Sequence, residues 1–513
     1  MSDHRPEDEF APMEGAPLWI AGVLLALANF MVVLDITIAN VSVPNIAGGL
    51  AVSPDQGTWV ITSYSVAEAI TVPLTGWLAQ RFGAVRVFCV AMVSFGACSA
   101  LCGLAPSFGA LVTFRVFQGL SGGPMMPLSQ TLMRRVFPAR LQPMALGLWG
   151  MTTVVGPIAG PLLGGVLVDG PGWPWVFYIN VPPALICAYL AWRMLNSRET
   201  ATERRPVDLF GLGLLIVWVG AMQIMLDKGK DLDWFGSSTI VALAILAALG
   251  FLAFINWELT EENPIVDLRV FLHRGFAASA AIMCVVYGTF FASVVLVPLW
   301  LQTSMGYTAT WAGRVTAWQG LFAVVLSPIV GRLTAKVDSR LLVCFGVAIM
   351  AVVSFWRAQF TSSAGYWDIA LPQILLGVAV PFFFIPLTGL GLSSVKPQEV
   401  ASAAGLLNFA RTVSGAFAVS ITTTAWDNTA RSHHVDLAGT LHDPGSTLNS
   451  MQSMGLTAQQ AVGALDNLVQ GEAVMVSTDH IFLISAVLFL VGAIVVWLAP
   501  KPTTQVAAGA GGH

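Results

Sequence analysis

The chain has 513 residues, of which 56% are hydrophobic and 10% are charged, and its mean hydropathy is +0.75. Soluble domains carry about 25% charged residues, so this composition excludes a soluble globular protein and indicates an integral membrane protein. The formal net charge of −4 says little, because the distribution of charge matters more than its sum. The six cysteines lack metal-ligand spacing and are interpreted as small buried hydrophobic residues.

Fourteen apolar segments are long enough to cross a bilayer, which takes about 20 residues per helix. The N-terminal residues 1–17 are acidic and lack the basic stretch of a signal peptide, so the first span is expected to remain in the mature protein. The long connection 426–479 is polar and is predicted to be an extracytoplasmic loop. The predicted spans lie near residues 18–39, 57–79, 85–105, 108–133, 142–168, 175–195, 208–226, 238–257, 275–301, 311–334, 340–360, 367–394, 401–425 and 480–499.

The distribution of lysine and arginine predicts the orientation, because short cytoplasmic connections are enriched in both. With the N-terminus in the cytoplasm, only Lys228, Lys230 and Arg431 fall clearly outside. Both chain ends are therefore predicted to be cytoplasmic. Of the 24 lysines and arginines, the 17 placed inside are Arg5, Arg81, Arg86, Arg134, Arg135, Arg140, Arg193, Arg198, Arg204, Arg205, Arg269, Arg274, Arg332, Lys336, Arg340, Lys396 and Lys501.

Asp35 is an acidic residue in the first span. A charged side chain at the centre of a membrane helix costs about 2.5–3.5 kcal/mol on insertion scales, so it usually faces the protein interior and carries function. At a rise of about 1.5 Å per residue, Asp35 is expected about 6 Å below the outer end of the span, near a helix break at Pro44.

The second span contains a polar stripe formed by Tyr64, Glu68, Thr71 and Thr75, which share one helical face. Glu68 is expected about 15 Å below the outer end, near the midplane. The stripe predicts that this helix faces an interior, so Glu68 is a candidate for binding a proton or a cationic drug.

The connection after span 2, residues 76–86, is short and rich in glycine and arginine, with Gly76, Arg81, Gly83 and Arg86. Such a turn suits a cytoplasmic hairpin whose cations interact with helix C-termini. A weaker copy follows span 10 in residues 331–340. Two copies at corresponding places suggest an internal repeat of the kind that builds transporters.

Span 4 carries Arg115 on one face with Gln118, Gly119 and Gly122. Arg115 is expected about 10 Å below the outer end of this span. A buried arginine requires a carboxylate or backbone carbonyls as partners. A purely structural ion pair and a functional cation are both open interpretations.

Span 5 contains a repeated pattern of small residues. Glycines at every fourth position form a ridge that permits close helix approach, and the two prolines each remove a backbone donor. Ordinary tight packing is the alternative interpretation. The residues of the pattern are Gly156, Pro157, Gly160, Pro161, Gly164 and Gly165.

Arg411 in span 13, beside Asn408, is an intramembrane cation in the C-terminal half. It is interpreted either as a partner of an anionic substrate or carboxylate, or as a side chain tethered to backbone carbonyls. The candidates for lining a substrate cavity are Tyr64, Gln118, Trp149, Trp318, Asn408 and Arg411.

Together these motifs resemble the major facilitator superfamily, whose signature connection resembles residues 76–86 except that Gln80 replaces an aspartate. The runs 34–44, 56–60 and 173–182, with fourteen spans, resemble its EmrB/QacA-type drug:proton antiporters, over about residues 17–500. The resemblance implies an all-α membrane protein with 14 transmembrane helices in two six-helix bundles plus two extra central helices. The implied divisions are a cytoplasmic tail 1–17, an N-terminal bundle 18–195, a two-helix insertion 196–258, a C-terminal bundle 275–499 and a cytoplasmic tail 500–513.

The resemblance also implies roles for the singled-out residues. Arg115 matches the span-4 arginine of the superfamily, which belongs to the proton-coupling machinery. From their depth and neighbours, Asp35 and Glu68 are hypothesised to be its carboxylates, and which of the two carries the proton stays open. The glycines and arginines of the 76–86 connection are implied in gating, and the span-5 pattern resembles an antiporter motif of exporters.

The expected function is proton-driven export of hydrophobic toxic compounds from the bacterial inner membrane, with the proton as coupling ion. No cofactor, metal or catalytic residue is expected, and no ATP-binding loop occurs in the sequence. The resemblance implies a periplasmic adaptor of the EmrA type and an outer-membrane TolC-like channel as partners. Export of one physiological compound, such as a fatty acid or siderophore, is an alternative. A membrane enzyme acting on lipid-linked substrates and a passive channel are the competing classes.

Overall fold

A computed structural model of the chain describes residues 13–203, 206–334, 336–441 and 443–500. All regular elements within these residues are helices, as expected. Most of the two predicted tails, together with Arg5, Arg204, Arg205 and Lys501 from the orientation argument, lies outside the described residues.

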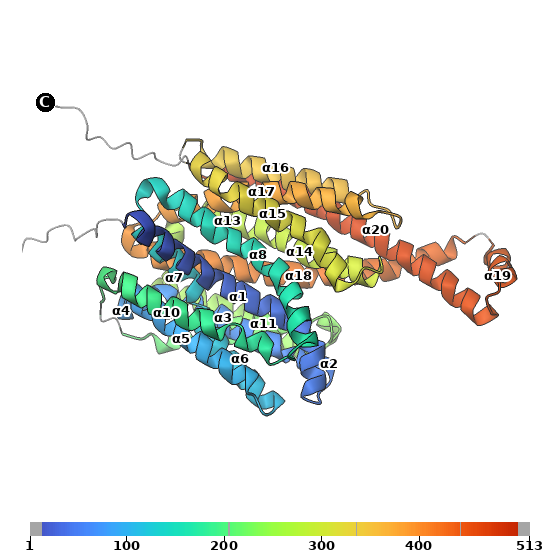
Figure 1. Cartoon of the computed structure of the whole chain (residues 1–513), viewed down its shortest axis with the longest axis horizontal. Helices are drawn as coiled ribbons and strands as arrows, with labels where there is room; N and C mark the ends of the chain where they lie inside the picture. The colour runs from blue at the N-terminus through green and yellow to red at the C-terminus, as the bar shows by residue number, and fades with distance from the viewer. Residues whose placement is uncertain (1–12, 204–205, 335, 442, 501–513) are drawn as a thin grey trace, which may run out of the picture.

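The N-terminal bundle contains the first ten α-helices (Figure 1). They are α1 (Gly15–Gly49), α2 (Pro54–Gly57), α3 (Trp59–Thr71), α4 (Thr75–Phe82), α5 (Ala84–Gly103), α6 (Phe108–Gly122), α7 (Met125–Val136), α8 (Gln142–Asp169), α9 (Trp175–Tyr178) and α10 (Val181–Leu195), with 3₁₀ turns at Ala139–Leu141 and Asn196–Arg198.

The insertion and the C-terminal bundle follow. The insertion consists of α11 (Leu209–Lys228) and α12 (Ser238–Thr260), and α11 packs on α3 of the first bundle and α18 of the second. The C-terminal bundle contains α13 (Arg274–Ile282), α14 (Gly288–Thr303), α15 (Ala309–Leu333), α16 (Ser339–Arg357), α17 (Tyr366–Ser393), α18 (Val400–Gly439), α19 (Pro444–Ser453) and α20 (Ala458–Val495). Short elements lie at Trp234–Gly236, Leu268–Leu272, Pro397–Glu399 and Val496–Leu498, and the π-helix Met283–Tyr287 joins α13 to α14.

Within the described residues, eleven helices are long and apolar enough to cross a membrane. Two further predicted spans are each divided into two short helices, at Pro73 between α3 and α4 and at Pro124 between α6 and α7. Proline removes a backbone donor and clashes with the preceding turn, which explains both interruptions. The eleven helices, these two divided spans and α8 together account for the fourteen predicted spans.

The first helix is longer than predicted. Pro44 lies inside α1, which continues to Gly49, so the predicted helix break at Pro44 is wrong. Asp35 is fourteen residues from the Gly49 end of α1, about 21 Å at 1.5 Å per residue, and not about 6 Å from a helix end. A proline inside a long helix bends it without ending it when neighbouring helices hold both halves in place.

The connection 426–479 is not a loop in the structure. Helix α18 runs through it to Gly439, α19 covers Pro444–Ser453, and α20 begins at Ala458. We call residues 426–479 the polar hairpin, and Figure 1 shows it projecting beyond the other helices. The polar composition predicts only that the segment does not lie within the membrane. It does not exclude helices, because a polar sequence can still be helical.

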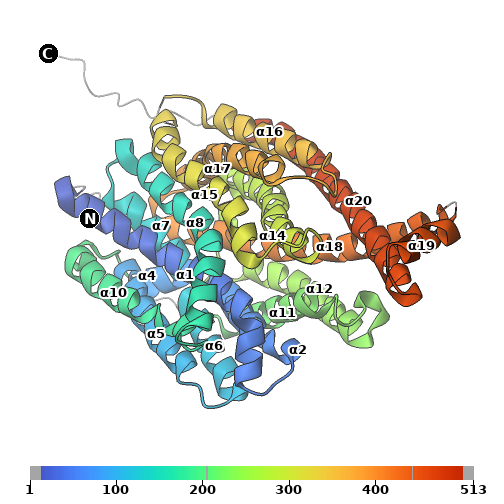
Figure 2. The same cartoon turned by 45° about the vertical axis from the view of Figure 1, so that its right-hand side comes forward.

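Figure 2 shows the two bundles side by side, with the insertion next to α18. The basic connections gather at one end, which we call the basic end. Both described chain ends lie there. Met13 N–H donates to the carbonyl of Val136, which follows Arg134 and Arg135, and Arg340 donates to the carbonyl of Ala499 near the other chain end. The polar hairpin projects from the opposite end.

Candidate functional site

A buried ion pair joins α1 to α6. Arg115 Nη1 donates to Asp35 Oδ2 at 2.6 Å, and both side chains are fully buried. Gln118 Nε2 and Asn180 Nδ2 donate to the other carboxylate oxygen at 3.1 and 2.7 Å. Buried charges are stable when they are paired and hydrogen-bonded. Both carboxylate oxygens of Asp35 accept hydrogen bonds, whereas Nη2 of Arg115 has no hydrogen-bond partner among the described residues. Asp35 is therefore the carboxylate that the buried Arg115 was expected to require.

The remaining contacts of Arg115 hold its guanidinium in one position. Its Nε donates to the carbonyl of Val60 at 2.9 Å, and Nη1 also donates to Gln118 at 2.8 Å. Its Cζ lies 4.2 Å from the centre of the Tyr64 ring, a cation–π geometry. Ser99 accepts from Gln118 at 3.1 Å and extends the network into α5. Asp35 and Arg115 therefore form a rigid centre inside the N-terminal bundle.

Glu68 stands apart from this network. Its side chain is 4% exposed, and its carboxylate has no hydrogen-bond partner among the described residues. The charged side chains near enough to interact with it are Arg411, Asp35 and Arg115. A buried carboxylate without fixed donors is free to exchange a proton or a ligand cation.

The polar stripe around Glu68 is shorter than predicted. Helix α3 ends at Thr71, and the hydroxyl of Thr71 donates to the carbonyl of Ala67. Thr75 belongs to α4 and donates to the carbonyl of Val72. The two threonines satisfy backbone carbonyls at the Pro73 interruption, whereas the Glu68 carboxylate of the same stripe accepts no hydrogen bond among the described residues.

Arg411 on α18 lies at the interface between the bundles and is 5% exposed. Its Nη2 donates to the sulfur of Met126 on α7 at 2.8 Å, and a thioether is only a weak acceptor. Its Cζ lies 5.6 Å from the ring centre of Trp149 and 5.7 Å from that of Tyr287. The guanidinium is thus enclosed by rings from both bundles and is not paired with a carboxylate among the described residues.

The two bundles meet closely near the basic end. Asn408 Nδ2 donates to Gln130 Oε1 at 2.8 Å across the interface. A Cβ atom at Gly76 would lie 2.8 Å from the Cα of Ser402, so only glycine allows α4 and α18 to approach this far. A Cβ at Gly405 would lie 3.0 Å from the carbonyl oxygen of Val72. The arrangement is closed at the basic end.

The glycine pattern of α8 packs against α1. A Cβ at Gly156 would lie 2.4 Å from a side-chain carbon of Val33, and one at Gly160 would lie 2.6 Å from the Cβ of Thr37. At Gly164 the nearest atom would be 3.5 Å away, and at Gly165 nothing lies within 4 Å. Only the first two glycines of the ridge therefore make close contacts, and these contacts hold α8 against the part of α1 that carries Asp35.

Helix α8 passes through positions 157 and 161 without a break. The side chains of Pro157 and Pro161 lie outside the described part of the structure.

The connection 76–86 forms the turn between α4 and α5. Gly83 has φ +93°, a conformation that favours glycine. Arg81 lies over the rings of Trp77 and Phe82, at 5.3 and 5.6 Å from their centres. Arg86 is exposed and lies 4.0 Å from a carboxylate oxygen of Glu199.

The predicted cavity candidates fall into three places. Tyr64 and Gln118 belong to the buried network of Arg115, whereas Trp149, Asn408 and Arg411 meet at the bundle interface. Trp318 lies elsewhere, on α15, where its Nε1 donates to Tyr366 Oη at 3.0 Å. The indole of Trp149 donates to Ser129 at 2.7 Å.

Sequence reasoning missed four residues of the site. Asn180 lies within the 173–182 run, but its bond to Asp35 joins residues 145 positions apart. Met126 and Gln130 on α7 carry no motif of their own, although α7 is the polar half of an interrupted span. Glu199, in the connection after α10, contacts the 76–86 turn and had no signal beyond its charge.

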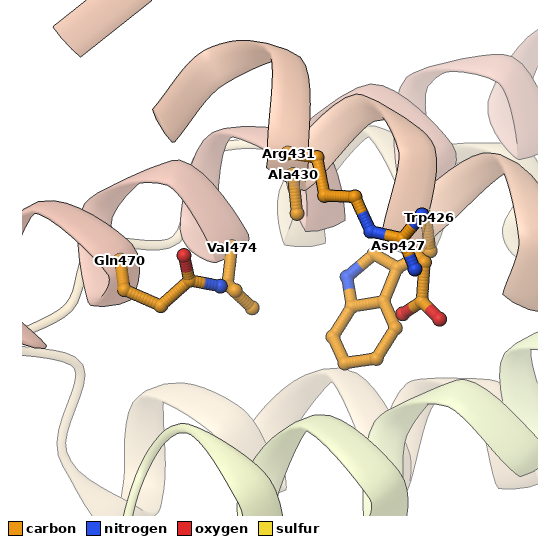
Figure 3. A pocket seen from close by; sticks show the side chains of 6 residues that line it. All are labelled: Trp426, Asp427, Ala430, Arg431, Gln470 and Val474. Carbon is orange, nitrogen blue, oxygen red and sulfur yellow. The ribbon is translucent and has the colours of Figure 1, made fainter. Parts of the chain in front are cut away.

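A separate hollow of about 230 Å³ lies in the polar hairpin. Figure 3 shows Trp426, Asp427 and Arg431 of α18 facing Gln470 and Val474 of α20 across it. Asp427 also pairs with Lys230 at 2.6 Å. This hollow is distinct from the Glu68 and Arg411 region.

The sequence matches the Major Facilitator Superfamily over residues 25–419. The proton:xylose symporter XylE, bound to 6-bromo-6-deoxy-D-glucose, has the same fold, with a TM-score of 0.59 and 14% identity over 94% of this chain and 96% of that one. The chain belongs to the Major Facilitator Superfamily, a class of membrane transporters.

Two relatives narrow the resemblance. Multidrug export protein EmrB of Escherichia coli (strain K12) is 44% identical over 507 residues, covering 98% of this chain and 99% of that protein. Fatty acid resistance protein FarB of Neisseria gonorrhoeae is 42% identical over 512 residues, covering 98% of this chain and 100% of that protein. The predicted resemblance to EmrB-type proteins is confirmed.

Proposed function

We propose that this chain is a proton-coupled antiporter of the bacterial inner membrane that exports hydrophobic toxic compounds. Similarity to EmrB along nearly the whole chain supports the export of drugs. The observation that carries the coupling is the contrast between two carboxylates. Asp35 is held by three donors, whereas Glu68 has none among the described residues.

In this scheme Glu68 exchanges the proton and the Asp35–Arg115 pair positions the helices around it. With the basic end closed, Glu68 takes up a proton from the opposite side. When the bundles open at the basic end, the proton leaves to the cytoplasm as the exported compound binds. A proton and a lipophilic cation then compete for one carboxylate, which is the condition for exchange.

The proposal includes the orientation and the partners. The basic end, with both chain ends, lies in the cytoplasm, as supported by the clustering of lysine and arginine there. The polar hairpin then projects into the periplasm, where it is the docking surface for an adaptor of the EmrA type, and a TolC-like channel completes the path.

The decisive experiment uses the purified protein in proteoliposomes that contain a pH-sensitive dye. Addition of a lipophilic cation such as ethidium to the wild type is expected to drive proton counterflow. Glu68→Gln is expected to abolish it. Asp35→Asn is expected to reduce it together with the folded yield, because Arg115 loses its counter-charge. Proton-driven export retained in both variants would overturn the scheme, and ethidium flux without proton flux would indicate a channel.

A separate experiment tests the partners. Replacing residues 440–457 by a short flexible linker keeps α18 and α20 and removes the tip of the polar hairpin. We expect this variant to insert and to remain monodisperse while adaptor co-purification is lost. Undiminished co-purification would exclude the tip as the docking surface.

The similarity to FarB favours a second candidate, export of a fatty acid. Growth inhibition of cells with and without the gene, measured for fatty acids and for lipophilic cations in parallel, separates the two. Protection against fatty acids alone would favour the dedicated exporter.

A further inference from the structure

The connection that follows α10 runs back along α4. The backbone N–H of Glu203 donates to the carbonyl of Gln80 at 2.8 Å, and Trp77 Nε1 donates to the carbonyl of Pro206 at 3.4 Å. Glu199 and Thr200 lie beside the start of α5. The connection to the insertion is therefore antiparallel to α4, with Glu199 at the turn between α4 and α5.

Glu199 and Thr200 together satisfy the first N–H groups of α5. Glu199 Oε1 accepts from Val85 N–H and Oε2 accepts from Arg86 N–H, both at 2.9 Å. Thr200 Oγ1 accepts from Ala84 N–H at 2.8 Å. A carboxylate at this position also interacts favourably with the positive end of the helix dipole. Glu199 thus caps α5 from outside its own sequence.

The turn between α4 and α5 has no acidic residue of its own between positions 76 and 86. Its N-cap residue Gly83 has no side chain to act as a cap. A Cβ at Gly83 would lie 2.4 Å from the Cδ of Glu199, so the missing side chain provides the space that the carboxylate fills. The two residues are complementary in shape.

Helix α4 lies between this contact and the opposite bundle. Gly76, one and a half turns before Arg81, lies against Ser402 of α18 at the closed basic end. The Glu199 carbonyl also accepts from Arg135 Nη2 of α7 at 3.3 Å. The position of α4 against α18 therefore depends on what holds the end of α4 in place.

We propose that Glu199 is a positioning residue for closure at the basic end. Its carboxylate, supplied by the connection to the insertion, holds the α4–α5 turn so that Gly76 can close on Ser402. The inference rests on the proposed alternating access and deepens it by naming the residue that stabilises its closed state. The contact also connects the insertion to the closed basic end, because residues 199–203 belong to the connection that leads to α11.

The test measures the closed state without substrate or proton gradient. Ser402→Cys, introduced beside Gly76, is labelled with a membrane-impermeant maleimide in inverted membrane vesicles, and the parent chain gives the background from native cysteines. Glu199→Ala is expected to raise the labelling rate of the thiol at position 402 by about tenfold, the size expected for losing a charged helix cap. Glu199→Gln, which keeps one carbonyl acceptor, is expected to lie between Glu199→Ala and the wild type.

Glu262→Gln is the matched control. Glu262 is an exposed carboxylate on another connection at the basic end, and its loss is expected to leave labelling unchanged. Equal labelling rates in Glu199→Ala and Glu262→Gln would overturn the proposal. The experiment also gives a result if export proves to be uncoupled from protons, so the two proposals fail separately.

A double-mutant cycle with Gly83→Ala tests the geometry. The strain of φ +93° is the same in both backgrounds, whereas the collision with the carboxylate exists only when Glu199 is present. Gly83→Ala is therefore expected to raise labelling more in the wild type than in the Glu199→Ala background. Additive effects would mean that Glu199 does not occupy the space beside Gly83, and would contradict the proposal even if Glu199→Ala alone were poorly folded.

Discussion

Two buried arginines, one inside the N-terminal bundle and one at the bundle interface, have opposite surroundings. Arg115 is paired with Asp35 at 2.6 Å and also donates to Val60 and Gln118. Arg411 donates to a thioether sulfur and is otherwise enclosed by aromatic rings. Both are charges removed from water, but only Arg115 has strong acceptors for its donors.

In the proposed function, this difference separates a structural role for Arg115 from a ligand-binding role for Arg411. A charge that is paired with an opposite charge resists change, because breaking the ion pair leaves the other charge buried and unpaired. A charge with weak partners keeps its capacity to bind an incoming group. The interface contains Arg411 and Glu68, which are held loosely, and the N-terminal bundle contains the fixed pair beside them.

The largest expected effect comes from Arg115→Met. It leaves Asp35 buried without its counter-charge and is expected to lower the free energy of unfolding by about 3–5 kcal/mol. Reversible unfolding of the purified protein in mixed micelles measures this change. Arg314→Met, at an exposed arginine 4.9 Å from the Trp311 ring, is the control and is expected to change little. A small loss in Arg115→Met would show that the pair is not a fixed centre.

A smaller loss is expected from Gly160→Ala, which presses a methyl group against Thr37 and displaces α8 from α1. Overpacking of this kind costs about 1–3 kcal/mol. Gly165→Ala changes the same pattern where nothing lies within 4 Å and is expected to be neutral. Thermal unfolding of both variants in detergent compares them directly, and equal losses would remove the packing explanation.

The Asn408–Gln130 hydrogen bond tests the interface itself. The coupling energy between Asn408→Ala and Gln130→Ala is expected to be about 0.5–1.5 kcal/mol in a double-mutant cycle of unfolding. A coupling of zero would mean that the two bundles are not closed through this contact in solution.

The smallest effect on stability is expected from Arg411→Met, the same substitution as at Arg115. Replacing a poorly paired buried cation by an apolar side chain of similar length is expected to change the free energy of unfolding by less than about 1 kcal/mol. Unfolding under the conditions used for Arg115→Met provides the measurement. A loss equal to that of Arg115→Met would abolish the contrast between the two arginines.

Several features were predictable because they follow from local sequence. Hydrophobic runs of about 20 residues predict spans, since each backbone group in lipid must be satisfied within its own helix. The same principle predicts that Asp35 and Arg115 each need a buried partner, because neither charge is stable alone in an apolar bundle. The glycine spacing of span 5 correctly predicts close helix approach, although only Gly156 and Gly160 make it.

Other features depended on contacts between distant residues. The end of α1 was misjudged because Pro44 is a local signal, whereas packing decides whether a helix continues past it. Asn180 and Glu199 could not be assigned, since their partners lie more than 100 positions away. Composition and periodicity thus determined the membrane class, the spans and the need for a buried ion pair. Tertiary packing alone decided that the Asp35 carboxylate accepts three hydrogen bonds while the Glu68 carboxylate accepts none among the described residues. The reason is that the helix faces that lie together determine which side chains can form hydrogen bonds.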